Sequence, residues 1–148
     1  MLLQKFLAPA STTETQLDAA NLLAGERGGL VMMGQDYAAL VVERDRQGDG
    51  LTLKYIHYED ARRGTVETMI ETVALPTNIG KLRFRTEVET GGRTVFSWAS
   101  EKGEFHSFNE TFQAMQGRWI GAKIGLFVEN NGILGEKGWI DFDYFRVR

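Results

Sequence analysis

Two runs in the last quarter of the chain decide the fold: GRWIGAKIGLFV at residues 117–128 and GWIDFDYFRVR at residues 138–148. Each run has the length of a β-strand, and a loop rich in Gly and Asn separates them. Successive side chains of a strand point to opposite faces. In the first run, one face carries Ile120, Ala122, Ile124, Leu126 and Val128, and the other carries Trp119, Lys123 and Phe127. The first face predicts core packing, and the second predicts contact with something outside the domain.

The second run places two carboxylates, Asp141 and Asp143, on the same side as Phe145 and Val147. A carboxylate that leans toward a core needs a backbone donor, a cation or a metal ion. Two acids on one strand face suit glycoside hydrolysis, but the apolar neighbours predict a packed face and no third acid stands at a suitable offset. We favour a structural role, in which Asp143 accepts backbone N–H bonds or helps to hold a calcium ion.

The rest of the chain is a succession of short β-type runs separated by turns. Residues 29–34 and 37–44 predict a hairpin around Gln35 and Asp36. Residues 51–59 and 82–89 alternate, with Leu82, Phe84 and Val88 pointing inward in the second of them. Residues 13–24 fit a helix face as well as a strand, and we favour a strand over residues 14–18. Ten or more short strands at this spacing predict an all-β sandwich or barrel.

Length and composition limit the classes of function. The 148 residues are enough for one domain with a full core, which we place at residues 1–148. A net charge of −3, with acids flanking Arg62, Arg63, Arg83 and Arg85, argues against a nucleic-acid partner. The sequence has no cysteine, which excludes disulfides, thiolate catalysis and cysteine-ligated zinc. No apolar run approaches the roughly 20 residues of a membrane span.

Several catalytic motifs are missing from the sequence. The two histidines, His57 and His106, are far apart and match no zinc-ligand spacing. No GxSxG turn and no phosphate-binding glycine loop occurs. We interpret both histidines as ordinary strand and loop residues.

Aromatic side chains are candidate platforms for sugar rings, because the C–H faces of a sugar ring are apolar. Trp98 is expected in the core, and Trp139, at a strand start, fits either core or surface. Trp119 stands opposite the core face of its strand and is the best candidate for an exposed or interdomain aromatic. Tyr37 and Tyr58 are further candidates, although we favour packing within the sandwich for them.

Five stretches, in this order and spacing, resemble one known family: GLVMMGQDYAALVVE, LKYIHYEDA, LRFRTEV, FQAMQGRWIGAKIGLF and DFDYFRV. From about Leu3 to Arg148, the chain resembles the concanavalin A-like C-terminal domain of glycoside hydrolase family 43 β-xylosidases and α-L-arabinofuranosidases. The resemblance implies a two-sheet antiparallel jelly-roll sandwich that packs against a separate five-bladed propeller, which holds the catalytic carboxylates. It implies no catalytic residue in this chain. It also matches the segment from Arg118 to Ala122 to the position of an aromatic that, in some β-xylosidases, reaches the rim of the substrate pocket, which puts Trp119 forward.

We therefore expect a non-catalytic accessory domain, part of a longer, periplasmic or secreted glycoside hydrolase that degrades xylan or arabinan. Its expected partners are the catalytic propeller of the parent chain and a carbohydrate containing xylose or arabinose. The candidate contact residues are Trp119, Arg118, Tyr37 and Phe127, and Asp143 is the candidate ligand of a structural calcium ion. The alternative is a free-standing carbohydrate-binding module for plant polysaccharides, which would need an exposed groove with at least two aromatic platforms. A third reading, a catalytic sandwich, would need an open cleft with two or three carboxylates.

Overall fold

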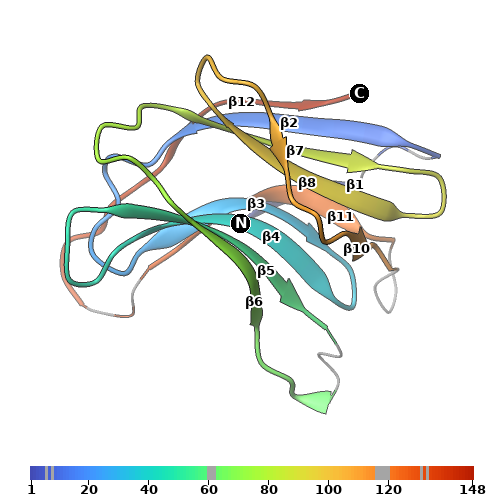
Figure 1. Cartoon of the computed structure of the whole chain (residues 1–148). Coiled ribbons are helices and arrows are strands. Elements are labelled where there is room, and N and C mark those ends of the chain that lie inside the picture. The colour runs from blue at the N-terminus through green and yellow to red at the C-terminus, as the bar shows by residue number, and fades with distance from the viewer. Residues whose placement is uncertain (6, 8, 60–62, 116–120, 131, 133) are drawn as a thin grey trace.

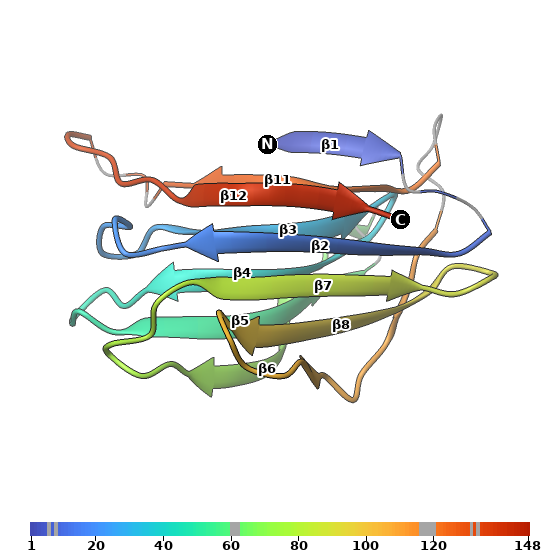
Figure 2. The ribbon, with the colours of Figure 1, turned by 90° about the horizontal axis from the view of Figure 1, so that it is seen from above.

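The computed structural model describes residues 1–5, 7, 9–59, 63–115, 121–130, 132 and 134–148. These residues form twelve β-strands and no α-helix, arranged as two sheets laid face to face (Figures 1 and 2). The strands are β1 (Leu2–Lys5), β2 (Ser11–Asp18), β3 (Arg27–Met33), β4 (Tyr37–Arg44), β5 (Leu51–Tyr58), β6 (Thr68–Ala74), β7 (Leu82–Val88), β8 (Arg93–Ser100), β9 (His106–Ser107), β10 (Phe112–Gln113), β11 (Lys123–Glu129) and β12 (Asp141–Val147). No described segment forms a helix long and apolar enough to cross a membrane.

Both sheets are antiparallel. Sheet A has the strand order β1-β11-β3-β4-β5-β6, and sheet B has the order β10-β8-β7-β2-β12 with β9 beside β8. Each sheet combines strands from both halves of the chain, since β11 lies between β1 and β3 in sheet A and β2 lies between β7 and β12 in sheet B. The predicted all-β, two-sheet sandwich is confirmed.

Most predicted strands lie where the alternation placed them. The segment that also fitted a helix is strand β2, and its buried residues Thr13, Thr15 and Leu17 alternate with half-buried polar ones. Thr is β-branched and favours a pleated strand over a helix. The predicted hairpin joins β3 to β4, where the Gly34 N–H donates to the Asp36 carbonyl at 2.8 Å. Strand β11 begins at Lys123, later than the predicted run.

The main core fills the space between the sheets. Sheet B contributes Phe84 and Phe96, and sheet A contributes Leu40 and Tyr55, all fully buried. The tilted Tyr55 and Phe96 rings meet across the sandwich with centroids 5.1 Å apart. The expected core role of Trp98 is confirmed in part, because it packs against this cluster while only partly buried. Burial of this many apolar side chains is the main driving force of folding.

The predicted orientation of the two carboxylates of β12 is wrong. Asp141 and Asp143 are exposed, whereas Phe142 and Phe145 pack against the main core. A β-bulge lies between Phe142 and Tyr144, so no residue of β2 stands opposite Asp143 in the strand register. One extra residue in a strand reverses which face each later side chain takes. Strict alternation would put Asp143 on the same face as Phe145, but the bulge puts the two side chains on different faces. The expected packed face with two carboxylates therefore does not form.

A buried carboxylate ties two loops together at one end of the sandwich. Glu26 is 2% exposed, and its Oε2 accepts hydrogen bonds from the backbone N–H groups of Leu23 and Gly138, each at 2.9 Å. Any Cβ at position 138 would collide with that same carboxylate. The absence of a side chain at Gly138 thus lets the segment before β12 lie directly on Glu26.

Candidate functional site

A second apolar cluster covers the outer face of sheet A, on the side away from the main core. Its buried members are Val31, Ala39, Val41 and Ile56, and its partly buried members are Leu3, Met33, Tyr37 and Phe127. Sheet A is therefore apolar on both faces, although the main core covers only one of them. An apolar cluster on the outer face of a sheet is a candidate interaction site or ligand-binding groove.

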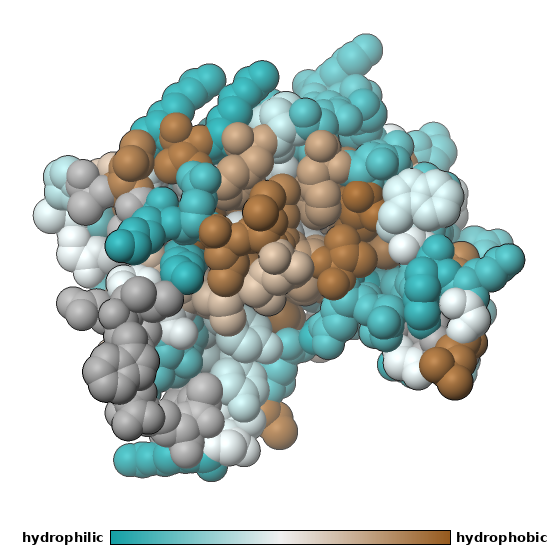
Figure 3. Space-filling view, turned by 180° about the vertical axis from the view of Figure 1, so that it is seen from behind, coloured by the Kyte–Doolittle hydropathy of each residue, from teal (hydrophilic) through white to brown (hydrophobic). Residues whose placement is uncertain are grey.

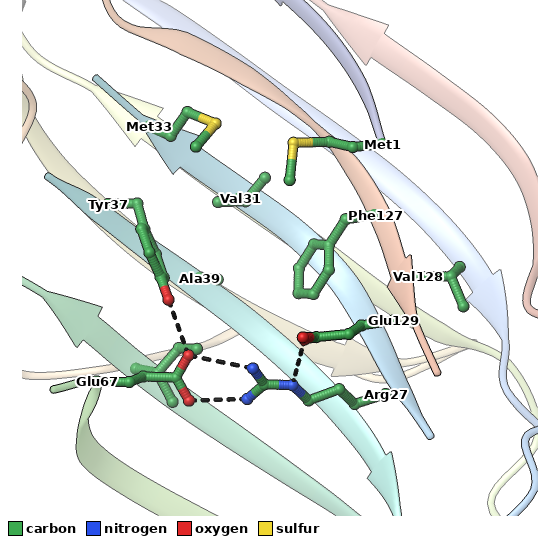
Figure 4. A pocket seen from close by; sticks show the side chains of 11 residues that line it. Met1, Arg27, Val31, Met33, Tyr37, Ala39, Glu67, Phe127, Val128 and Glu129 are labelled. Carbon is green, nitrogen blue, oxygen red and sulfur yellow. Dashed lines mark hydrogen bonds and ion pairs between the residues drawn. The ribbon is translucent and has the colours of Figure 1, made fainter. Parts of the chain in front are cut away.

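A pocket of about 360 Å³ opens on this outer face. Val31 and Ala39 line its floor, and the rings of Tyr37 and Phe127 stand on opposite sides of it (Figure 4). Met33 lies at one end of the view and the charged side chains lie at the other. We call this the outer-face pocket; its full lining is Met1, Arg27, Val31, Met33, Tyr37, Ala39, Ile56, Glu67, Phe127, Val128 and Glu129.

Three charged side chains form the polar rim of the outer-face pocket. The Arg27 guanidinium contacts Glu67 at 2.7 Å and Glu129 at 2.8 Å. The Tyr37 hydroxyl donates to Glu67 Oε2 at 2.9 Å. Arg27 begins β3 and Glu67 immediately precedes β6, and two strands separate β3 from β6 in sheet A. The sheet must therefore curl toward its outer face for this ion pair to close.

The charges of the rim set the protonation of its members. Burial favours the neutral form of Glu67, but hydrogen bonds from Arg27 and Tyr37 outweigh it and hold the pKa of Glu67 below its usual range. Burial, together with the hydrogen bond to Glu67, raises the pKa of Tyr37. At neutral pH the rim thus includes the neutral phenol of Tyr37, the guanidinium of Arg27 and the carboxylate of Glu67.

The Tyr37 ring is held in place by a neighbour on the next strand. Tyr37 and Tyr58 are opposite each other in the β4–β5 register, and their rings stack with centroids 5.1 Å apart and planes 4° from parallel. Aromatic cross-strand pairs of this kind stabilise a sheet and limit side-chain motion. One wall of the outer-face pocket is therefore preformed.

A second apolar surface lies along the open edge between the two sheets. Edge strand β1 of sheet A, with β11 beside it, and edge strand β12 of sheet B border this surface, and Figure 3 shows hydrophobic side chains gathered across the middle of this side. Met1 is 72% exposed and Leu2 is 71% exposed. We call this surface the apolar edge; it surrounds a groove of about 630 Å³ lined by Met1, Leu2, Leu126, Phe127, Val128, Phe142, Tyr144 and Phe145. It continues into the outer-face pocket through Met1, Phe127 and Val128.

The structure brings two of the predicted contact residues together. Tyr37 and Phe127 both line the outer-face pocket, from strands β4 and β11. Trp119 and Arg118 lie outside the described residues, so their predicted contacts stay predictions. The sequence reasoning missed Arg27, Glu67 and Glu129. The alternation that places Phe127 outward also places Glu129 outward, and that signal could have identified it.

Asp143 has a cationic partner of its own. Its Oδ2 accepts hydrogen bonds from Lys81 Nζ and Gln16 Nε2, each at 2.6 Å. The Lys81 hydrogen bond lowers the pKa of this carboxyl group. Among the residues that the structure describes, no group of three or more His, Asp or Glu side chains could hold a metal ion. The described contacts of Asp143 are thus with Lys81 and Gln16, and the calcium role stays a prediction.

Several enzymes that act on glycosides contain a region similar to this chain. A β-xylosidase of Formosa agariphila is 27% identical over 135 residues, which make up 90% of this chain and 20% of the relative. A bifunctional GH43-CE structure from Bacteroides eggerthii superposes with a TM-score of 0.83 at 18% identity, over 99% of this chain and 18% of its own. A xylan β-1,4-xylosidase from Bacillus halodurans superposes with a TM-score of 0.76 at 19% identity, over 95% of this chain and 28% of its own.

The chain thus spans about a fifth of the length of the curated relative it matches. At these identities the structural likenesses establish the fold, which is the expected concanavalin A-like sandwich. The match to a family of defined domains is more specific, because it covers residues 1–148. The chain belongs to the family of β-xylosidase C-terminal concanavalin A-like domains.

Proposed function

We propose that this chain is a non-catalytic accessory domain of a family 43 glycoside hydrolase, and that it packs against the catalytic propeller of its parent through the apolar edge. The observation that carries the proposal is the exposure of Met1 and Leu2 beside Phe142 and Phe145 on one continuous surface. Leaving such a surface in water is costly, and burying it against another module removes the cost. The similar proteins, in which a domain of this fold is a minor part of a longer chain, support the same reading.

The carboxyl groups support a role without bond cleavage. A glycosidase needs a carboxylic acid whose pKa is raised so that it can donate a proton. Burial acts to raise the pKa of Glu14, but hydrogen bonds from Tyr144 and Arg85 overcome it and lower the pKa. The pKa values of Glu67 and Asp143 are lowered as well. These three groups therefore act as hydrogen-bonded ion-pair partners in the folded domain.

The domain also supplies an aromatic to the substrate pocket of its parent in this proposal, and Trp119 is the residue assigned to that role. The described residues on either side of Trp119 are Met115, after β10, and Gly121, before β11. An aromatic at a pocket rim acts by shape and by excluding water rather than by proton transfer. Trp119→Ala in the parent enzyme should raise KM or lower kcat for an aryl xyloside or arabinofuranoside. Trp139→Ala, which removes an exposed tryptophan elsewhere, is the matched control.

Packing through the apolar edge is tested separately by Leu2→Asp in the parent enzyme. A domain docked through this edge should unfold together with the propeller, so calorimetry of the unaltered parent should show one unfolding transition. Leu2→Asp should weaken the docking and give two separate transitions. Leu134→Asp is the control, because Leu134 is 97% exposed and lies outside the apolar edge. An unsplit transition in Leu2→Asp would refute docking at this edge, and unchanged kinetics in Trp119→Ala would remove the aromatic contribution.

A free-standing carbohydrate-binding module is the second candidate, and the two aromatic walls of the outer-face pocket favour it. The two roles differ in what the isolated chain does. Calorimetric titration of the isolated chain with soluble xylan and arabinan distinguishes them. Polysaccharide binding by the isolated chain, combined with a parent in which Leu2→Asp has no effect, would favour the binding module.

A further inference from the structure

We propose that the outer-face pocket binds a ring of a neutral sugar. This goes beyond packing against a propeller, because it gives the domain a ligand of its own. The pocket combines two features that sugar recognition needs. Tyr37 and Phe127 provide apolar ring faces on opposite sides, and Arg27, Glu67 and Glu129 provide charged hydrogen-bonding groups at one end (Figure 4).

The walls match the two kinds of surface on a pyranose ring. The axial C–H groups of a pyranose form an apolar face that packs on an aromatic ring, and its equatorial hydroxyls form a polar edge. In the outer-face pocket the floor of Val31, Ala39 and Ile56 is buried and apolar. A sugar ring whose C–H face packs against Phe127 therefore gives up few hydrogen bonds to water on that face. Its hydroxyls remain available for hydrogen bonds with the rim.

The rim has hydrogen-bonding capacity left after its internal contacts. Arg27 is 25% exposed and Glu129 is 56% exposed at their side chains, even though they are paired at 2.8 Å. A carboxylate has two oxygens and about four acceptor sites, and the hydrogen bond from Arg27 Nε uses one site on Glu129. Glu129 can thus accept hydrogen bonds from sugar hydroxyls without breaking the ion pair that shapes the pocket.

Charge and size select the ligand class. One guanidinium and two carboxylates leave the rim with a net negative charge, which disfavours uronates and other anionic sugars. The volume of about 360 Å³ lies at the lower end of the range of about 300–1,000 Å³ for small-molecule pockets. The pocket therefore fits a small ligand, such as one sugar ring and its linkage. A ligand with so few atoms should bind with a dissociation constant on the order of 1 mM.

Two adjacent methionines give an internal control for the test. Met33 lines the outer-face pocket, whereas Met32, the preceding residue, is fully buried on the opposite face in the main core. In methyl-resolved NMR of the isolated chain, titration with methyl β-D-xylopyranoside should shift the Met33 methyl signal and leave the Met32 signal in place. The choice of a xyloside rests on the proposed function, but the titration is repeated with methyl β-D-glucopyranoside, which is independent of it.

Charge selection is tested with a matched pair of ligands. The β-D-glucuronide has the ring of the glucoside and an added carboxylate, so it should bind about fivefold more weakly at low salt. Equal affinity for the two would overturn the assignment to neutral sugars.

Two variants locate the ligand in the pocket. Phe127→Ala removes one aromatic wall and should weaken binding by about tenfold. Ala39→Leu places a larger side chain on the floor and should abolish binding, and circular dichroism checks that each variant is folded. Trp139→Ala should bind like the unaltered chain.

The proposal is overturned if no sugar shifts Met33, if Met32 shifts equally, or if folded Phe127→Ala binds with unchanged affinity. Each of these results leaves packing through the apolar edge intact, because that role is tested by the unfolding of the parent enzyme and not by sugar binding.

Discussion

Replacing Glu67 by Gln should destabilise the domain at neutral pH. Glu67 accepts two hydrogen bonds from Arg27, at 2.7 and 3.3 Å, and one from Tyr37 at 2.9 Å. Buried hydrogen bonds to a charged group contribute about 1.5–3 kcal/mol each, whereas exposed ion pairs contribute about 0–1 kcal/mol. The side chains of Arg27 and Glu67 are 25% and 28% exposed, so an intermediate value applies. Because Gln keeps the size and one acceptor, we expect a loss of about 1–1.5 kcal/mol.

The assay is urea unfolding followed by tryptophan fluorescence, with thermal unfolding as a second measurement. A loss of this size lowers the melting temperature of a domain of this length by about 3–5 °C. Glu89→Gln is the matched control, because the Arg93–Glu89 ion pair has side chains that are 53% and 55% exposed. The control should lose less than about 0.5 kcal/mol.

The pH dependence of the Glu67 effect has a definite sign. The pKa of Glu67 is lower in the folded state than in the unfolded chain, where an unperturbed glutamate titrates near about pH 4.3. The stabilisation is therefore complete above that pH and is lost as the pH falls through the lowered folded pKa. The difference between the unaltered chain and Glu67→Gln should be constant from about pH 8 to pH 5 and shrink below that. A difference that is absent at pH 7, or that grows on acidification, would refute this account of the rim.

Three further predictions concern groups outside the outer-face pocket. Burial lowers the pKa of His57, although the charges of Glu59 and Glu110 act in the opposite direction. As the pH falls, His57 is therefore protonated in the unfolded chain before it is protonated in the folded domain. The free energy of unfolding should thus decrease from about pH 7 to pH 5. Urea unfolding at both pH values should show a smaller fall in His57→Phe. Glu26→Gln weakens the two hydrogen bonds from backbone N–H groups and should cost about 2 kcal/mol in thermal unfolding. If Asp143 binds calcium, added calcium should raise the melting temperature of the unaltered chain but not that of Asp143→Asn. If Asp143 only pairs with Lys81, added calcium should have the same effect on both proteins.

Alternation predicted the faces of the regular strands because each strand has one face on the main core. Leu82, Phe84 and Val88 on β7 are all buried, as their spacing indicated. The same reasoning failed on β12 because a bulge depends on how two strands pair and not on one strand alone. Asp143 is the unpaired residue there, and nothing in residues 138–148 marks it as such.

The outer-face pocket could be predicted only in part. The continuous apolar run at residues 29–33 indicates a strand buried on both faces, and the second cluster around Val31 agrees with it. The rim could not be predicted, because Arg27 and Glu67 meet across two intervening strands. That meeting depends on the curl of sheet A, which is a property of the whole sheet.

The outer faces of the two sheets differ in their apolar content, and this difference indicates where a partner is expected. On sheet B, Glu14 pairs with Arg85 at 2.8 Å and Asp143 pairs with Lys81 at 2.6 Å, so the charges of that face are satisfied in contact with water. The outer face of sheet A also has ion pairs, of Arg27 with Glu67 and Glu129 and of Lys54 with Glu43, but these border an apolar cluster centred on Val31, Ala39, Val41 and Ile56. Ion pairs of this kind gain little from being buried by a partner, because burial removes their hydration. Apolar side chains gain free energy from burial in proportion to the area covered. A propeller or a sugar ring is therefore expected on sheet A and its apolar edge, and the outer face of sheet B is expected to stay in solvent.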